Sequence, residues 1–381
     1  MRKWSILLLV LIAGIISGCG GSSSGTAPTI NYGLPTAAVL PTSATMGGTV
    51  QKKALVMNAA IEPFAGAITG PLGTAGLLDG TGAVARFSHP TDITTDGKNF
   101  YVADYLNNAI RQIDATGVVQ ILTCTDIATG LPIAFNHPTG ITTDGVNIYV
   151  ADSGSNTIRM IDITTKKVTI IGSTTGVAGS IDSPVITDVR FNQPIGITTD
   201  NINVYVTDAG NNTIRWFDIA TRNVHTLAGT AGSAGAADGT QTNARFNSPA
   251  RLTTDGTSLY VTDFLNRTIR KVDIATGTVT TIAGNASVGP GRVDATGIGT
   301  VAIFNQPNGI TTDGSNLYVT DSYNNTIYSI DKATLVVTKI AGSTGVNGFS
   351  NTLLDTPTGL TTDGTALYVA DSVNNTLRMI K

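Results

Sequence analysis

From about residue 54 onward, short apolar segments and polar turns recur as a pattern of six similar units. Each unit opens with a proline and an apolar stretch, which a polar turn such as 309–314 separates from a second stretch such as 317–321. A third stretch follows, as at 326–331 in the same unit. A fourth stretch completes each of the first five units, as at 279–284 in the preceding unit. Gly, Asn and Asp between the stretches suit tight hairpin turns because they tolerate positive φ. The pattern therefore predicts six antiparallel meanders of four strands each.

The spacing of the units indicates how the meanders are assembled. Successive intervals between the leading prolines are 48, 56, 55, 58 and 50 residues; these prolines are Pro90, Pro138, Pro194, Pro249, Pro307 and Pro357. A strand such as 317–321 carries apolar side chains on both faces, so each sheet needs cover on both sides. Neighbours packed face to face around a ring supply that cover. The chain is therefore predicted to be all-β, with a six-bladed β-propeller of four-stranded antiparallel blades over residues 54–381.

The sixth unit stops at its third strand, 376–381, and lacks a fourth. Ahead of the first unit, residues 61–66 align with the fourth strand at 279–284. We therefore expect an N-terminal strand to complete the last blade, which would remove the open edges of an unclosed ring.

The repeat also resembles a known family. The segments 191–197 (FNQPIGI), 204–208 (VYVTD) and 211–215 (NNTIR) are similar to the NHL repeat, and the likeness covers nearly all of residues 54–381. This resemblance implies a six-bladed propeller of the kind that serves mostly as a binding platform for proteins or RNA. Related propellers include a peptidyl-hydroxyglycine amidating lyase, streptogramin lyase and lactonase-like enzymes, so the fold alone does not fix the function.

The first 53 residues are predicted to be an export signal followed by a tether. Arg2 and Lys3 precede an apolar stretch at 6–16, and Ser17 and Gly18 precede Cys19, an arrangement that resembles a bacterial lipobox. We expect residues 1–18 to be a lipoprotein signal peptide, because the stretch is short for a membrane span. The alternative is an ordinary signal peptide or an uncleaved anchor, with Cys19 incidental. Residues 19–53, rich in Gly, Ser, Pro and Thr, then form a flexible tether.

The expected address is the cell envelope, with the chain held in the membrane by a lipid on Cys19. By resemblance to Gram-negative lipoproteins, Gly20 after the cysteine favours the outer membrane. Without residues 1–18 the chain carries 21 basic and 26 acidic residues, a net charge of −5. This balance argues against a nucleic-acid partner. The other cysteine, Cys124, is expected to be a packed thiol; no disulfide, no cofactor and a monomeric chain are expected.

Residues that recur in every unit are expected to be framework. An Asp ends the second strand of all six units: Asp104, Asp152, Asp208, Asp263, Asp321 and Asp371. These carboxylates could hold a cation, but we expect them to accept hydrogen bonds from their own turns. Third-strand arginines recur in five units, with Tyr328 as the exception: Arg111, Arg159, Arg215, Arg270 and Arg378. They, with Arg86, Arg190 and Arg245, could bind phosphate, but pairing with nearby Asp along the blade surfaces is expected.

Residues that differ between units are better candidates for a ligand site. The position before the leading proline is occupied by His89, His137, Gln193, Ser248, Gln306 and Thr356. By the family resemblance the innermost strand follows that proline, so these side chains are expected to line one mouth of the central channel. A metal or catalytic role for His89 and His137 lacks a third ligand, since His225 lies on a fourth strand near an outer edge. The long, unlike loops at 172–190, 229–245 and 284–304 are either recognition elements or spacers.

Two functions remain open on the sequence. The first is an envelope-anchored, non-enzymatic binding or scaffold lipoprotein that presents one propeller face to a protein, peptide or glycan. The alternative is a metal-assisted lyase or lactonase-like enzyme with its site at the channel mouth around His89 and His137.

Overall fold

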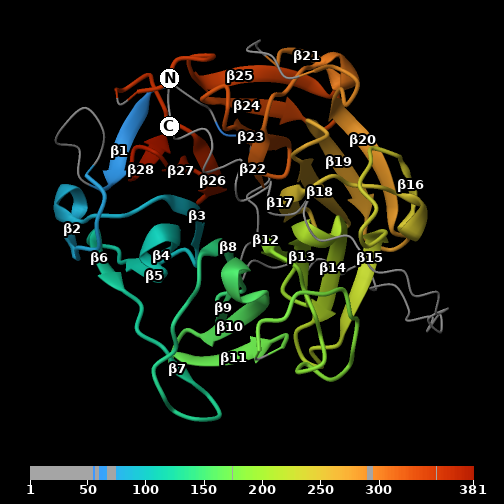
Figure 1. Cartoon of the computed structure of the whole chain (residues 1–381). Coiled ribbons are helices and arrows are strands. Elements are labelled where there is room, and N and C mark those ends of the chain that lie inside the picture. Colours follow the sequence, from blue (N-terminus) through green and yellow to red (C-terminus); the bar gives the residue numbers. More distant parts are fainter. Residues whose placement is uncertain (1–54, 56–59, 67–73, 174, 290–294, 349) are drawn as a thin grey trace.

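The computed structural model describes residues 55, 60–66, 74–173, 175–289, 295–348 and 350–381, which form six β-sheets arranged around a central axis (Figure 1). The expected signal peptide, Cys19 and the expected tether of residues 19–53 lie outside the described residues. No helix among the described residues is long and apolar enough to span a membrane. The all-β propeller with six blades is confirmed.

The first strand of each blade is innermost, and successive first strands adjoin one another in a closed ring. We number the blades by these strands, which are β3 (Pro90–Thr95), β8 (Pro138–Thr143), β12 (Pro194–Thr199), β17 (Pro249–Thr254), β22 (Pro307–Thr312) and β26 (Pro357–Thr362). The second strands are β4 (Phe100–Asp104), β9 (Asn147–Asp152), β13 (Asn203–Asp208), β18 (Ser258–Asp263), β23 (Asn316–Asp321) and β27 (Leu367–Asp371).

The third strands are β5 (Ala109–Ile113), β10 (Thr157–Asp162), β14 (Thr213–Asp218), β19 (Thr268–Asp273), β24 (Thr326–Asp331) and β28 (Thr376–Ile380). The fourth strands are β6 (Val118–Ile121), β11 (Lys167–Ile171), β15 (Val224–Gly229), β20 (Thr278–Gly284), β25 (Val336–Gly342) and, for the last blade, β1 (Ile61–Ala65). Strand β1 pairs antiparallel with β28, with Ile61 opposite Ile380 and Ala65 opposite Leu377. The predicted closure of the ring by an N-terminal strand is therefore confirmed.

In the part of the chain that the structure describes, four blades have a fifth strand, which the four-stranded prediction missed. The loop that leads into the blade contributes two residues to its outer edge: β2 (Gly80–Thr81), β7 (Thr125–Asp126), β16 (Gly239–Thr240) and β21 (Gly297–Ile298). The strand β7 pairs parallel with β11, whereas the other three pair antiparallel. The inter-blade loops therefore cover blade edges that would otherwise expose unpaired backbone groups.

Single-turn 3₁₀ helices complete the regular structure. Three of them follow the loop strands, namely η1 (Gly82–Val84), η5 (Gln241–Asn243) and η6 (Gly299–Val301). The other three connect second to third strands, namely η2 (Tyr105–Asn107), η3 (Ser153–Ser155) and η4 (Ala209–Asn211).

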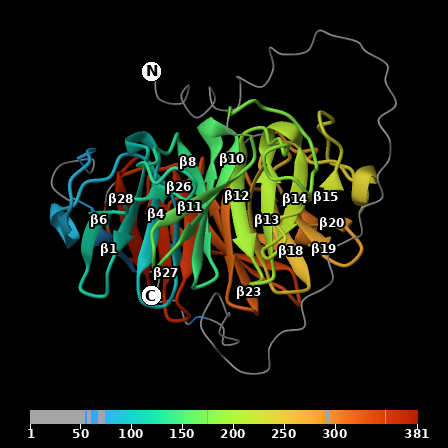
Figure 2. The same ribbon diagram turned by 90° about the horizontal axis from the view of Figure 1, so that it is seen from below.

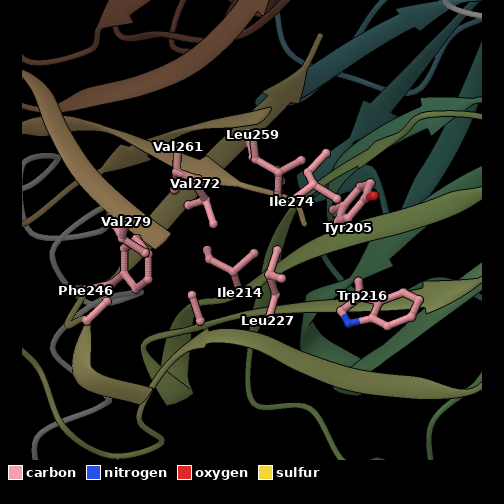
Figure 3. Close-up of a cluster of buried hydrophobic side chains, with 13 residues drawn as sticks. Tyr205, Ile214, Trp216, Leu227, Phe246, Leu259, Val261, Val272, Ile274 and Val279 are labelled. Atoms are coloured by element: carbon pink, nitrogen blue, oxygen red, sulfur yellow. The ribbon is translucent and has the colours of Figure 1, made fainter. Parts of the chain in front are cut away.

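The hydrophobic core is divided into six clusters, one between each pair of neighbouring blades. Between blades 3 and 4, Ile214 and Leu227 face Val261 and Val272 (Figure 3). Between blades 6 and 1, Phe64 of β1 contacts Phe100 and Tyr368, with ring centroids 4.9 and 4.7 Å apart. Each sheet is thus covered on both faces, as the apolar pattern predicted.

The two faces of the ring differ in what they carry. We call the loop face the side formed by the residues before the leading prolines, the turns from second to third strands, and the inter-blade loops. The hairpin face is the opposite side, with the turns from first to second and from third to fourth strands. The chain ends on the hairpin face, after β28 (Figure 2). Turns there are closed by aspartates as predicted: Asp96 accepts hydrogen bonds from the backbone N–H of Lys98 and Asn99.

Candidate functional site

The six variable residues before the prolines, which we call the pre-proline ring, all lie on the loop face where the innermost strands begin. Five are half-buried and Ser248 is buried. Five adopt left-handed backbone conformations, with φ of 53° at His89, 51° at His137, 49° at Gln193, 52° at Ser248 and 55° at Thr356. This conformation costs a non-glycine residue roughly 1–2 kcal/mol, so the surroundings must hold it in place.

An asparagine from the preceding blade fixes each of these five residues. The backbone N–H of His137 donates to Oδ1 of Asn108 at 2.7 Å, and that of Gln193 donates to Oδ1 of Asn156 at 2.7 Å. The same bond joins Ser248 to Asn212, Thr356 to Asn325, and His89 to Asn375. We call these bonds asparagine latches. They link the blades around the loop face, so the pre-proline ring is rigid at its backbone.

Gln306 is the exception, and its neighbour explains why. The position of the latch asparagine in blade 4 is occupied by Arg267. The backbone N–H of Gln306 instead donates to Oδ1 of Asp321 in its own blade, at 2.9 Å. The ring therefore has five latched junctions and one that is built differently, between blades 4 and 5.

The two histidines of the ring have different surroundings. The His137 ring lies 4.8 Å from the Tyr105 ring, and its Nδ1 lies 2.8 Å from Oδ1 of Asn136. Burial lowers the pKa of His89, while the negative charge of Asp355 opposes the shift. The third histidine, His225, lies on β15 against Trp216, as predicted for an outer strand. Within the described residues, no group of three His, Cys, Asp or Glu side chains is arranged to hold a metal ion.

The axis of the ring contains an ion pair that the sequence analysis missed. Two residues after the leading proline, four blades have glycine, whereas blade 1 has Asp92 and blade 4 has Arg251. These blades lie three apart, on opposite sides of the ring, and Nε of Arg251 lies 3.4 Å from Oδ2 of Asp92. Both side chains are buried, and burial raises the pKa of Asp92 while Arg251 and two backbone N–H groups oppose the rise.

Arg251 of the axial pair also bonds groups on two inner strands. Nη2 of Arg251 donates to the carbonyl oxygen of Thr91 at 2.6 Å, and Nη1 donates to Oδ1 of Asn308. The glycines at the equivalent positions allow close approach: a Cβ on Gly196 would lie 2.6 Å from Cα of Arg251. The signal was present in the sequence, since comparison of the units shows Asp92 and Arg251 as departures from glycine.

The recurring aspartates are framework, as predicted, with more partners than their own turns. Oδ1 of Asp104 accepts from the backbone N–H of Ser88 at 2.7 Å, and Oδ2 accepts from Asn107 and Arg111. Burial raises the pKa of Asp104 to about 6, against the lowering by these donors. All six second-strand aspartates are buried.

The prediction that the third-strand arginines lie along blade surfaces is wrong. Arg111, Arg215 and Arg270 are fully buried, because each guanidinium bonds both the second-strand Asp and a loop Asp. For Arg215 these partners are Asp208 at 3.0 Å and Asp182 at 2.5 Å. Arg111, Arg215 and Arg270 therefore fasten the inter-blade loops to the blades, and these three are not available to phosphate.

Tyr328 of blade 5 and the arginines that precede the Phe of three units also form hydrogen bonds with backbone groups. Where Tyr328 replaces the arginine, its hydroxyl accepts a hydrogen bond from the backbone N–H of the loop residue Ala295 at 3.1 Å. Arg86 donates to the carbonyl oxygen of Val84, while Arg190 and Arg245 likewise bond backbone carbonyls beside them. The inter-blade loops thus cover the blade edges and also form variable surface.

Cys124 is buried in the cluster between blades 1 and 2, as predicted for a packed thiol. Burial raises its pKa to about 11, while Lys166 has a smaller opposing effect. The thiolate that reactive cysteines require is therefore disfavoured.

Comparison with known proteins finds relatives that match part of the chain. No protein-family model matches it. NHL repeat-containing protein 2 of Bos taurus is 35% identical over 105 residues, which are 26% of this chain and 14% of that protein. Protein SUPPRESSOR OF QUENCHING 1, chloroplastic, of Arabidopsis thaliana is 38% identical over 92 residues, which are 24% of this chain and 9% of that protein. The matches thus span about a seventh or less of these relatives.

Two solved structures share the fold. An auxiliary nutrient binding protein from Bacteroides thetaiotaomicron VPI-5482 has a TM-score of 0.64 at 15% identity, over 84% of this chain and 76% of that one. A protein with the same description from Bacteroides ovatus ATCC 8483 has a TM-score of 0.62 at 19% identity, over 85% and 77% of the two chains. The chain is a six-bladed β-propeller, and part of it is similar in sequence to an NHL repeat-containing protein.

Proposed function

We propose that the protein is a non-enzymatic binding or scaffold protein of the cell envelope, which holds a protein, peptide or glycan on its loop face. One observation carries the proposal: the pre-proline ring, where the blades differ, lies on that face, and the long loops between blades start and end there. The ring is held rigid by the asparagine latches. Variable positions on a rigid scaffold are where recognition usually resides. The names of the two Bacteroides propellers describe binding proteins, which supports a binding role here.

The turns beside the pre-proline ring add apolar contact surface. The second residue after the recurring Asp is Leu106 in blade 1 and Tyr323 in blade 5, with 40% and 44% of their surfaces exposed. Blades 2 and 3 have Gly154 and Gly210 at this position. An aromatic ring and a leucine near half-buried polar side chains offer both apolar contact and hydrogen bonds. The glycine side of the ring leaves more room, so the face is asymmetric.

The proposed lipid anchor suits recognition on the loop face. The backbone N–H of Leu55 donates to Oδ2 of Asp313, in a hairpin-face turn, at 3.0 Å. From there the chain continues to β1, which starts at its hairpin-face end with Ile61 opposite Ile380. The tether would thus join the domain on the hairpin face. A lipid on Cys19 and a tether of residues 19–53 would leave the loop face free to turn away from the membrane.

Photo-crosslinking in intact cells tests the proposed face. A photoreactive amino acid at Leu106 or Tyr323 should capture one common neighbour, because both lie on the loop face. The matched controls are Lys98 and Thr116, which are exposed on the hairpin face. Capture of the same neighbour only from the hairpin face would overturn the proposal. Stoichiometric zinc or calcium in the purified protein, lost in a His89→Ala, His137→Ala double variant, would favour the lyase or lactonase alternative.

The anchor has its own test. Cys19→Ser should move the protein from the membrane fraction to the aqueous fraction of a detergent phase separation, and should abolish labelling by a clickable fatty acid. Ser17→Ala, which keeps a small residue in the lipobox, serves as the control. Unchanged membrane fractionation of Cys19→Ser would contradict lipid anchoring.

A further inference from the structure

Blade 2 departs from its siblings at the third-strand arginine. In blades 1, 3 and 4, Nη2 of the arginine lies 2.5–2.8 Å from a loop aspartate: Arg111 with Asp79, Arg215 with Asp182, and Arg270 with Asp238. In blade 2, both Nε and Nη2 of Arg159 bond Oδ2 of Asp152, at 2.9 Å. Within the described chain, Asp152 is the one hydrogen-bonding partner of this guanidinium.

The different loop of blade 2 explains the missing aspartate. The interval from Pro90 to Pro138 is 48 residues, the shortest of the five. The loop pairs in parallel with β11 through β7, where the others pair antiparallel. Its acid, Asp126, caps its own turn by accepting from the backbone N–H groups of Ala128 and Thr129. Hydrogen bonds from Thr129 and, more weakly, the charge of Arg159 lower the pKa of Asp126.

A pocket of about 280 Å³ lies at this place on the loop face, and Arg159 lines it. The guanidinium side chain is 9% exposed, so it is desolvated yet borders the pocket. Ser155, Thr175 and Asn136, which carry hydroxyl and amide groups, also line the pocket. Guanidinium next to hydroxyl and amide groups is a setting suited to a carboxylate that carries further polar groups.

Blades 1, 3 and 4 show which chemical group fits beside the arginine at this position. The loop aspartates also accept a hydrogen bond from a fourth-strand backbone N–H, as Asp238 does from Thr281 at 3.1 Å. The residue opposite Arg159 on the fourth strand is Ile170, the counterpart of Thr281 opposite Arg270, and Ile170 lines the pocket. A carboxylate placed there would complete the arrangement of two acids around one arginine found in blades 1, 3 and 4.

We propose that the pocket over Arg159 in blade 2 binds the carboxylate of a small ligand, in the place that a loop aspartate occupies in blades 1, 3 and 4. The carboxylate comes from a sugar acid or from a peptide C-terminus, which present the same group to the arginine. This site does not rest on the proposed role of the pre-proline ring, and the crosslinking test at Leu106 and Tyr323 is independent of it.

Titration of the full mature chain with four probes tests the proposal. Glucuronate represents a sugar acid and N-acetylglycine a peptide terminus, while glucose and N-acetylglycinamide are their neutral counterparts. The acids should bind saturably at one site, with amide shifts in the NMR spectrum at Ser155 and Thr175, and the neutral compounds should not. The tighter acid identifies the source of the carboxylate.

Two variants locate the site. Arg159→Gln should weaken binding roughly ten- to hundredfold, as expected for a charge-assisted bond. Because that change also affects buried Asp152, Thr175→Trp fills the pocket from an exposed position and should abolish binding in a folded protein. Asp238→Ala opens the same place in blade 4, where the carboxylate is half-exposed, and should raise the stoichiometry from one to two. Equal binding of glucose and glucuronate, or full binding by both Arg159→Gln and Thr175→Trp, overturns the proposal.

Discussion

Oδ1 of Asn375, in the last blade, lies 2.9 Å from the backbone nitrogen of His89, in the first blade, and accepts its hydrogen bond. This bond joins residues 286 positions apart. It is the same asparagine latch that joins neighbouring units elsewhere in the ring, so on the loop face the closing junction is built like an ordinary one. At the outer edge of the last blade, strand β1 closes the ring by pairing with β28.

Removal of this latch should measurably weaken the ring. Asn375→Ala is expected to lower the free energy of unfolding by about 1–2 kcal/mol, since it removes a hydrogen bond and places Ala in a left-handed conformation at φ 53°. Urea unfolding followed by circular dichroism measures the change. The matched control is Arg267→Ala, at the equivalent position without a latch, where a smaller loss is expected. Equal losses in both variants would show that the latch adds nothing.

The N-terminal strand should be required for a stable ring. A chain beginning at residue 67 lacks β1, which exposes the edge of β28 and removes Phe64 from its contacts with Phe100 and Tyr368. We expect it to lose the cooperative thermal transition. A chain beginning at residue 55 keeps β1 and is the control. An unchanged melting temperature for the shorter chain would refute the role of β1.

The fold was predictable from the sequence because the same pattern of strands and turns recurs in six units. Strand order, blade number and the pairing of 61–66 with the tail all follow from aligned turns and apolar stretches. The fifth strands did not follow, because a two-residue strand such as Gly80–Thr81 has no periodicity of its own. It exists because the loop crosses the blade edge, which is a tertiary effect.

The candidate site was predictable only in part. The alignment found the pre-proline ring but could not show that Asn108 or Asn375 holds its backbone, since those residues belong to the neighbouring blade. The arginines were placed on the surface because charged side chains usually lie there. Their burial depends on loop aspartates such as Asp182, which align poorly between units of different loop length.

The axial pair should be strongly coupled. Asp92→Gly leaves Arg251 buried without its carboxylate, and a loss of about 3–5 kcal/mol in the free energy of unfolding is expected. Glycine is the residue that four sibling blades carry there. The Asp92→Gly, Arg251→Gly double variant removes both charges and should recover much of that loss. A double-mutant cycle by urea unfolding gives the coupling energy. Strictly additive losses would mean that the pair does not interact.

The titration of His89 should report its half-buried position on the loop face. Burial lowers its pKa from 6.5, and Asp355 partly opposes this. In the folded protein the proton is therefore held less readily than in the unfolded chain. As the pH falls through 6.5 the unfolded state takes up a proton that the folded state does not, so the free energy of unfolding falls with it. Well above pH 6.5 both states are neutral at His89 and this contribution is constant.

NMR titration of the imidazole signals measures this directly, with His89→Gln assigning the resonance. Gln is the residue that blade 3 carries at the same position with φ 49°, so the variant should keep the fold. Asp355→Asn should lower the pKa of His89 further, because it removes the one charge that raises it. The decrease in stability between pH 7.5 and 5.5 should be smaller in His89→Gln than in the unchanged protein. A His89 pKa at or above 6.5 would contradict a half-buried imidazole and would indicate that the side chain is solvated on the loop face.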